Sequence, residues 1–226
     1  MTHLLDRPVW SALATRHAAF ARGDDLARKY DPAIVPFAAT ASDDAEGLRA
    51  LETLVSPGES VLMLQVDPIV LPAGLSAVST AVGVQMIGGA APKAVSDPAV
   101  EPLSADDAAE MLALATLTRP GPFTARALAL GEFWGVRIQG RLAAMAGERK
   151  KQPGHTEISG VCAHPDFRGQ GLARRLSLFV ADRIVQRGET PYLHAYATNA
   201  AAIGLYESIG FRIRDEVNVA VVQRIG

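Results

Sequence analysis

The sequence predicts an α/β fold, because apolar runs of strand length alternate with stretches of helical periodicity. Residues 133–138 alternate in polarity, turn at Gln139-Gly140 and return over 142–147, which is typical of an antiparallel hairpin. Apolar residues then recur at helical spacing from Leu172 to Ile184, before a capping Gly188. With 226 residues, 49% of them apolar, the chain can bury a sizeable core in one large domain or two small ones.

The charge and cysteine content exclude several classes of protein. The 22 basic and 24 acidic residues leave a net charge of −2, so we expect neither a nucleic-acid partner nor binding to an anionic membrane. The single Cys162 cannot form an internal disulfide, and without a second cysteine we expect no metal site. The first residues do not resemble a signal peptide, and no apolar run is long enough to span a membrane. We therefore expect a cytoplasmic protein.

The first half of the chain contains helices and strands but no motif that indicates catalysis. His17 has no second ligand nearby in the sequence, so we interpret it as a packed or surface residue. A segment rich in glycine, alanine and proline, 88–93, is a candidate domain boundary. The expected elements are a helix over 6–22, a strand over 34–39, a helix that begins at the capping box Asp43-x-x-Glu46, and strands over 61–66 and 77–87.

The second half predicts strands around a central segment that ends in a glycine-rich loop. A helix that starts near Ser104 is broken by 119–122, and a second helix is expected over 124–130. Residues 149–154 form a basic turn, which we interpret as a solvated surface. Residues 155–163 then form the central strand, whose end feeds the loop.

The loop after the central strand has the composition of an anion-binding site. Gly169 and Gly171 allow the backbone to approach a ligand closely, and the following helix presents unpaired N–H groups at its first turn. Arg168, Arg174 and Arg175 add positive charge. These features predict a pyrophosphate cradle, and the alternative is a tight turn that needs two glycines for its own geometry.

Two motifs in this half resemble the GNAT superfamily of acyl-CoA-dependent N-acyltransferases. The pattern Arg168-x-x-Gly171-x-Ala173 after His164-Pro165 is similar to the acyl-CoA loop of that superfamily. Residues 193–211 are similar to its strand, asparagine, helix, Leu-Tyr and Gly-Phe pattern. The resemblance covers roughly residues 96–226.

The resemblance implies a mixed, mostly antiparallel sheet flanked by helices over residues 96–226. Residues 1–95 would then form an additional N-terminal α/β subdomain, or alternatively a degenerate second copy of the same fold. In the family the central strand splays away from the next strand, 192–197, and the pantetheine arm of acetyl-CoA lies in the gap. The resemblance assigns cofactor contacts to the strand end, the loop and one asparagine: Val161, Cys162, Ala163, Arg168, Gly169, Gln170, Gly171, Leu172, Ala173 and Asn199. Asn199 is also a good helix N-cap, and these two roles remain open.

The resemblance also proposes groups for the chemistry. Tyr206 matches the family tyrosine that protonates the departing thiolate, and the alternative is a tyrosine that only packs against the sheet. Glu157 is a candidate general base, because on a regular strand it shares a face with Val161; a bulge would reverse that face, and an ordinary salt bridge is an equal alternative. His194 is the second candidate base. Cys162 lies in an apolar strand, so we do not expect a nucleophile.

These observations predict transfer of an acetyl group from acetyl-CoA directly to a primary amine. The acceptor is a small amine, an amino-acid derivative or a protein or peptide amine. In the family the connection that holds Arg119 and Phe123 lies over the acceptor site, so both are candidates for acceptor contacts, and the alternative is an ordinary surface loop with one anchoring aromatic residue. The alternative is a catalytically silent module that binds or senses acyl-CoA. A homodimer through the apolar run 77–87 remains open, although a buried strand explains that run equally well.

Overall fold

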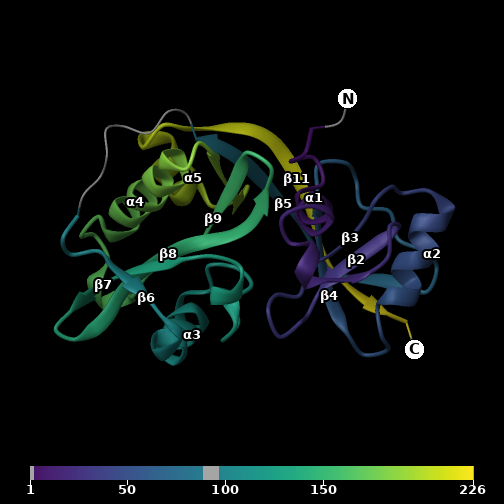
Figure 1. Cartoon of the computed structure of the whole chain (residues 1–226), viewed down its shortest axis with the longest axis horizontal. Coiled ribbons are helices and arrows are strands. Elements are labelled where there is room, and N and C mark those ends of the chain that lie inside the picture. Colours follow the sequence, from purple (N-terminus) through teal and green to yellow (C-terminus); the bar gives the residue numbers. More distant parts are fainter. Residues whose placement is uncertain (1–2, 89–96, 226) are drawn as a thin grey trace.

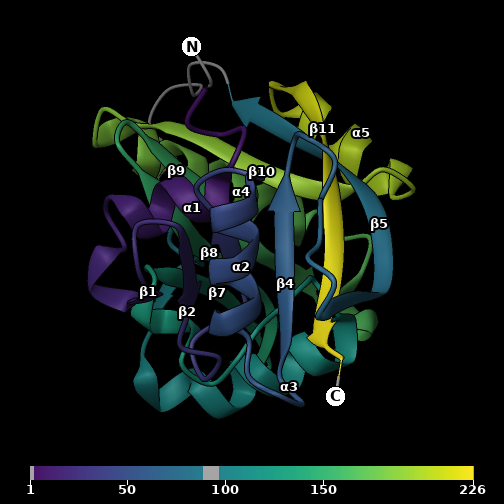
Figure 2. The ribbon, with the colours of Figure 1, turned by 90° about the vertical axis from the view of Figure 1, so that its right-hand side faces the viewer.

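A computed structural model describes residues 3–88 and 97–225 (Figures 1 and 2). The helices are α1 (Pro8–Ala14), α2 (Ala45–Leu54), α3 (Ala108–Thr118), α4 (Leu172–Gln186) and α5 (Ala200–Ser208). The strands are β1 (Ala21–Gly23), β2 (Ala27–Tyr30), β3 (Ala38–Thr40), β4 (Ser60–Gln65), β5 (Leu75–Gly88), β6 (Glu101–Leu103), β7 (Phe133–Ile138), β8 (Arg141–Gln152), β9 (His155–Ala163), β10 (Thr190–Tyr196) and β11 (Phe211–Arg224).

The main sheet has eight strands in the order β4-β11-β5-β10-β9-β8-β7-β6. All neighbouring pairs are antiparallel except β9 and β10, which confirms the predicted mixed, mostly antiparallel sheet. The parallel ladder ends where Tyr192 pairs with Glu157, and the two strands share no further pairs beyond it. The predicted splay between the central strand and its neighbour is therefore confirmed.

Helices cover both faces of this sheet. On one face α4 packs through Leu176 and Val180 against a core that includes Ile158 of β9. On the other face α3 packs through Met111 and Leu114 against a second core that includes Cys162. The two cores hold β9 from opposite sides, so the end of this strand is fixed in position.

The structure corrects the expected division into residues 1–95 and 96–226. Strands β4 and β5 belong to the main sheet, and β5 lies between β10 and β11. Figure 1 shows β5 and β11 running together from the part that holds α4 and α5 to the part that holds α2 and β4. The predicted boundary segment 88–93 lies outside the described residues except for Gly88. Only residues before β4, with the small sheet β1-β2-β3, form an accessory layer.

Several local predictions also need correction. Residues 149–152, expected in a solvated basic turn, belong to β8, and Lys150 is fully buried. The strand expected over 34–39 is confined to β3 at Ala38–Thr40. The helix expected over 6–22 is shorter, because α1 ends at Ala14 and only a 3-10 turn follows at Ala18–Phe20. Asp44, not Asp43, caps α2, because the Asp43 carboxylate is engaged by Arg7. The helix expected over 124–130 is reduced to a 3-10 turn at Ala127–Ala129.

Candidate active site

A bulge in β9 decides which side chains face the splay. Register passes from Ser159 opposite Gly147 to Cys162 opposite Met145, so three steps on β9 match two on β8. Gly160 supplies the extra residue with φ +65°, a left-handed conformation that glycine adopts at low cost. Ile158 and Val161 consequently pack on the same core although they are three residues apart. Glu157 therefore lies on the face opposite to Val161, as expected for a bulged rather than a regular strand.

The glycine loop forms an open cradle at the start of α4. Gly169 and Gly171 have φ values of 76° and 71°, so both glycines are required by the backbone conformation. No side chain caps α4, which leaves the N–H groups of its first turn directed outward for an anionic ligand. The uncapped N–H groups favour the predicted pyrophosphate cradle over the alternative of a tight turn that needs two glycines for its own geometry.

A cavity of about 550 Å³ runs from this cradle along the end of β9. Arg175 was expected to add positive charge to this cradle, but its guanidinium instead pairs with Asp97. Gln170 is exposed and is not part of the cavity wall. Of the residues predicted to contact the cofactor, the following line the cavity: Val161, Cys162, Ala163, Arg168, Gly169, Gly171, Leu172, Ala173 and Asn199.

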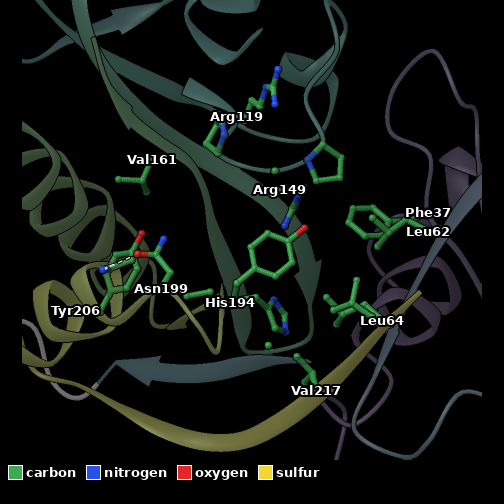
Figure 3. A pocket seen from close by; sticks show the side chains of 18 residues that line it. Phe37, Leu62, Leu64, Arg119, Arg149, Val161, His194, Asn199, Tyr206 and Val217 are labelled. Atoms are coloured by element: carbon green, nitrogen blue, oxygen red, sulfur yellow. Dashed lines mark hydrogen bonds between the residues drawn. The ribbon is translucent and has the colours of Figure 1, made fainter. Parts of the chain in front are cut away.

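Asn199 has the capping role that the sequence left open. Its Oδ1 accepts a hydrogen bond from the Ala202 backbone N–H at 3.1 Å, which caps α5 (Figure 3). The same side chain lines both the 550 Å³ cavity and a second cavity beside it. Capping fixes the amide in place, and contact with the cofactor stays a prediction.

The second cavity adjoins the first and measures about 170 Å³ (Figure 3). The two share Arg119, Pro120, Val161, Asn199 and Ala202 as wall residues. Tyr206 also lines the second cavity, and its hydroxyl makes no hydrogen bond to any residue that the structure describes. Burial raises the pKa of Tyr206 to about 12, so the phenol remains a proton donor at neutral pH.

The far wall of this second cavity comes from parts of the chain that carry no motif. Phe37 follows the accessory sheet strand β2, and Leu62 and Leu64 lie on β4. Val217 and Val219 of β11 complete the apolar side. Sequence reasoning missed these residues, because their proximity to Tyr206 depends on the insertion of β5 and on the sheet order. Arg119, by contrast, was expected near the acceptor and lines both cavities.

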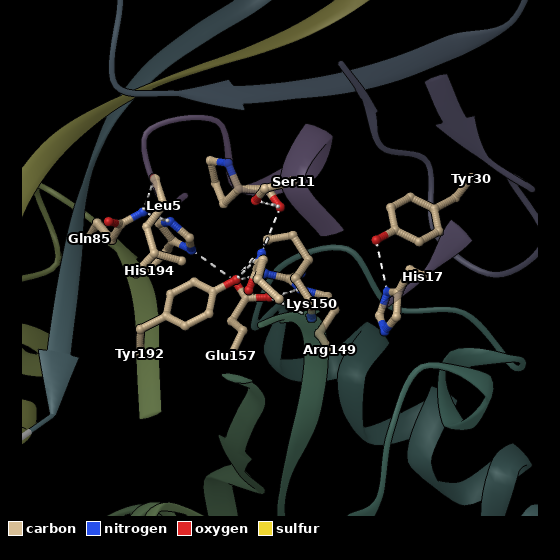
Figure 4. Close-up of polar contacts among 12 residues, drawn as sticks. Leu5, Ser11, His17, Tyr30, Gln85, Arg149, Lys150, Glu157, Tyr192 and His194 are labelled. Carbon is tan, nitrogen blue, oxygen red and sulfur yellow. Dashed lines mark hydrogen bonds and ion pairs between the residues drawn. The ribbon is translucent and has the colours of Figure 1, made fainter. Parts of the chain in front are cut away.

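Glu157 lies in a buried ion-pair cluster beneath the second cavity (Figure 4). Its Oε2 accepts from Arg149 Nε at 2.8 Å, and its Oε1 accepts from Arg149 Nη2 at 3.0 Å and from Lys150 Nζ at 2.8 Å. The adjacent residues Arg149 and Lys150 reach the same carboxylate because β8 is bulged between Glu148 and Lys151. Burial alone would raise the pKa of Glu157, but the two cations hold it well below its usual value.

This cluster changes the interpretation of Glu157. Its side chain is fully buried and does not line either cavity. Both carboxylate oxygens are engaged by cations, so a proton from an acceptor can reach Glu157 only if an ion pair breaks. The structure shows the salt-bridge arrangement that the sequence left as an equal alternative, and a role as base has no geometric support.

His194 is held between Glu157 and Gln85. Its Nδ1 lies 2.8 Å from Glu157 Oε1, and its Nε2 lies 3.0 Å from Gln85 Nε2. Gln85 Oε1 accepts from Arg214, so the Gln85 amide nitrogen donates and His194 Nε2 accepts. Burial lowers the pKa of His194 to about 4, which keeps the ring neutral with its proton on Nδ1. His194 lines the second cavity, but both of its ring nitrogens are engaged by Gln85 and Glu157.

Other chemistries find no support in the described residues. Burial raises the pKa of Cys162 to about 11, so its thiol is protonated at neutral pH, in line with the expectation that it is no nucleophile. Within residues 3–88 and 97–225, no group of three or more histidine, cysteine and acidic side chains is placed to hold a metal ion. No helix in the same part of the chain is long and apolar enough to cross a membrane.

Comparison with solved structures identifies the family. A crystal structure of an acetyltransferase of the GNAT family from Novosphingobium aromaticivorans is 40% identical, with a TM-score of 0.94 over 100% of both chains. The chain belongs to the GNAT family. A family model described as FR47-like protein matches residues 134–220 of this GNAT protein. A GCN5-related N-acetyltransferase from Kribbella flavida shares the fold, with a TM-score of 0.66 at 17% identity over 98% of this chain and 96% of that chain.

A curated relative matches a short stretch of this GNAT protein. The ribosomal protein bS18 alanine N-acetyltransferase of Escherichia coli K12 is 46% identical over 52 residues. The match spans 23% of this chain and 35% of the relative. The chain therefore spans about a third of that enzyme's length.

Proposed function

We propose that this GNAT protein transfers an acetyl group from acetyl-CoA directly to a primary amine of a small-molecule or peptide acceptor. The observation that carries the proposal is the pair of adjoining cavities, one against the uncapped start of α4 and one lined by Tyr206. Their shared wall at Val161, Asn199 and Ala202 would be the place where acetyl donor and amine meet. The name of the Escherichia coli relative, an alanine N-acetyltransferase that matches over 52 residues, supports the same assignment.

The residues of this chain divide the work as follows. The first turn of α4, with Arg168 and Arg174, would bind the pyrophosphate, and the backbone of 161–163 would hold the pantetheine arm in the splay. The amine nitrogen forms a bond to the acetyl carbon, the C–S bond breaks, and the thiolate takes a proton from Tyr206. The amine loses one proton, which returns through solvent to the Tyr206 phenolate, so amide, thiol and the original phenol are the balanced products. Glu157 would act as a positioning residue that fixes Arg149 and His194.

Titration calorimetry with acetyl-CoA, followed by thiol release with a panel of amines, tests this proposal. We expect binding in the micromolar range and thiol release that depends on the amine. Binding without release for any amine would instead support the silent acyl-CoA module. No binding would remove the assignment of the cradle itself.

A further inference from the structure

We propose that the acceptor is a small aminocarboxylate with an apolar substituent, and that Arg149 is the anchor for its carboxylate. This inference rests on the proposed acetyl transfer, because it concerns the amine that occupies the 170 Å³ cavity. It would distinguish the acceptor from a polyamine, a lysine side chain or a peptide N-terminus.

The charges that line the cavity favour an anionic acceptor. Arg119 and Arg149 both line it, whereas no aspartate or glutamate of the described residues does. Arg119 makes no ion pair with any residue that the structure describes. A polyamine would meet two like charges with no counter-charge, whereas a carboxylate would be attracted to the same surface.

The Arg149 guanidinium is oriented with one nitrogen left for a ligand. Glu157 takes its Nε and Nη2, which fixes the plane of the group. The Nη1 nitrogen makes no hydrogen bond within residues 3–88 and 97–225 and lies on the side of Gly121, another wall residue of the cavity. The two N–H groups of Nη1 are thus available for charge-assisted hydrogen bonds to a ligand carboxylate.

The buried cluster also carries more cations than anions. Arg149 and Lys150 share the single carboxylate of Glu157, and Lys150 has no exposed surface. Burial and the neighbouring Arg149 lower the pKa of Lys150 to about 7, although Glu157 acts in the opposite direction. A carboxylate bound at Arg149 would complete the balance of charge.

The rest of the cavity fits a short apolar substituent. Phe37 lies 5.0 Å below the Arg149 guanidinium and continues into the apolar wall of Leu62, Leu64 and Val217. A volume of about 170 Å³ is below the usual range of about 300–1,000 Å³ for drug-sized ligands. The site therefore accommodates a molecule of amino-acid size, with its carboxylate and its apolar part on adjoining walls.

A positive charge beside the amine reduces the need for a carboxylate base. With the acceptor carboxylate paired to Arg149, Arg119 disfavours the ammonium form relative to the neutral amine, so the pKa of the bound amine falls. The proton goes to solvent through the open side of the cavity, and the lone pair remains on nitrogen for attack. This explains how acetylation proceeds while both oxygens of Glu157 stay engaged.

Thiol-release kinetics with matched amines test the inference. The probes are L-leucine, L-phenylalanine and L-methionine, compared with leucinamide, 3-methylbutylamine, spermidine and an alanine-initiated peptide. We expect kcat/KM for leucine to exceed that for leucinamide by about 10–100-fold, the range of a charge-assisted hydrogen-bonded pair. Equal or faster acetylation of leucinamide, spermidine or the peptide would overturn the inference and leave the proposed acetyl transfer intact.

Binding of the product analogue gives a second readout that does not depend on turnover. In the presence of CoA we expect N-acetyl-leucine to bind at least about tenfold more tightly than N-acetyl-leucinamide. Arg119→Met and Arg149→Lys should each reduce that preference, since Arg149→Lys keeps the charge but loses the Nη1 donors directed at the ligand. Arg212→Met, at an exposed position outside both cavities, is the matched control. Equal affinity for the two analogues in the wild type would refute the carboxylate anchor, whereas failure to bind CoA would refute the proposed function.

Discussion

Glu157→Gln separates a structural role of the cluster from a role in proton transfer. The variant keeps the shape of the side chain but removes the only carboxylate that compensates Arg149 and Lys150. Loss of one partner from a buried ion pair costs about 3–5 kcal/mol of unfolding free energy. For a chain of this size each kcal/mol corresponds to roughly 2–4 °C, so we expect a fall in Tm of roughly 6–20 °C at pH 7.

The loss should depend on pH in a defined direction. With its pKa near 7, Lys150 sheds its proton as the pH rises, so fewer uncompensated charges remain in the variant. The fall in Tm should therefore be larger at pH 6 than at pH 9. The double variant Glu157→Gln/Lys150→Met should recover part of the stability, because it removes the second cation as well.

Thermal unfolding followed by circular dichroism, together with kcat on the same samples, decides the question. Glu207→Gln is the control, since Glu207 is exposed on α5 and makes no ion pair in the described part of the chain. A Tm for Glu157→Gln within about 2 °C of the wild type, with kcat reduced about a hundredfold, would refute the positioning role. It would restore Glu157 as the base.

Three further predictions concern the acid, the cradle and stability in acid. Tyr206→Phe should lower kcat by about 10²–10³-fold with Tm and CoA affinity unchanged, because its hydroxyl bonds to no described residue; unchanged kcat would remove the assigned donor. Gly171→Ala and its control Gly140→Ala should each lose about 1–2 kcal/mol of unfolding free energy, since both glycines have φ above 70° and open space at Cβ. Calorimetry should nevertheless show weaker CoA binding for Gly171→Ala alone. Burial lowers the pKa of His17 to about 4, so below pH 6.5 the unfolded chain binds more protons than the folded chain. Stability should therefore fall as the pH is lowered, by about 2 kcal/mol at pH 5. Urea unfolding at pH 8 and pH 5 should show a smaller loss of stability in His17→Gln, and an equal loss in that variant would assign the effect to another group.

Local signals predicted the conformation of the glycine loop and the start of α4, while binding of a cofactor there stays a prediction. The glycine conformations at 169 and 171 and the start of α4 follow from residues that are adjacent in the sequence. The splay between β9 and β10 could be predicted only from the family resemblance, because no residue type or sequence pattern marks the point at which two neighbouring strands separate. Tyr206 was placed correctly at a cavity, while its role in protonation stays a prediction.

The acceptor side was not predictable in the same way. The position of Glu157 depends on bulges in β8 and β9, and a one-residue shift in register moves a side chain to the opposite face. Gly160 was visible in the sequence, but glycine within a strand indicates only that a bulge is permitted. Phe37 and Leu64 reach the cavity through the sheet order, which depends on contacts between distant segments.

The position of β5 between β10 and β11 has a consequence for how the chain folds. Among the residues that the structure describes, β11 pairs with β4 and β5, which both lie in the first 88 residues, and the contact between Gln85 and Arg214 joins residues 129 positions apart. Closing such long loops slows folding, since chain entropy is lost before the contacts form. During synthesis both edges of β5 stay unpaired until β10 and β11 have emerged. The segments before and after Gly88 should therefore fold together. A fragment that starts after Gly88 would lack β5, the strand with which both β10 and β11 pair.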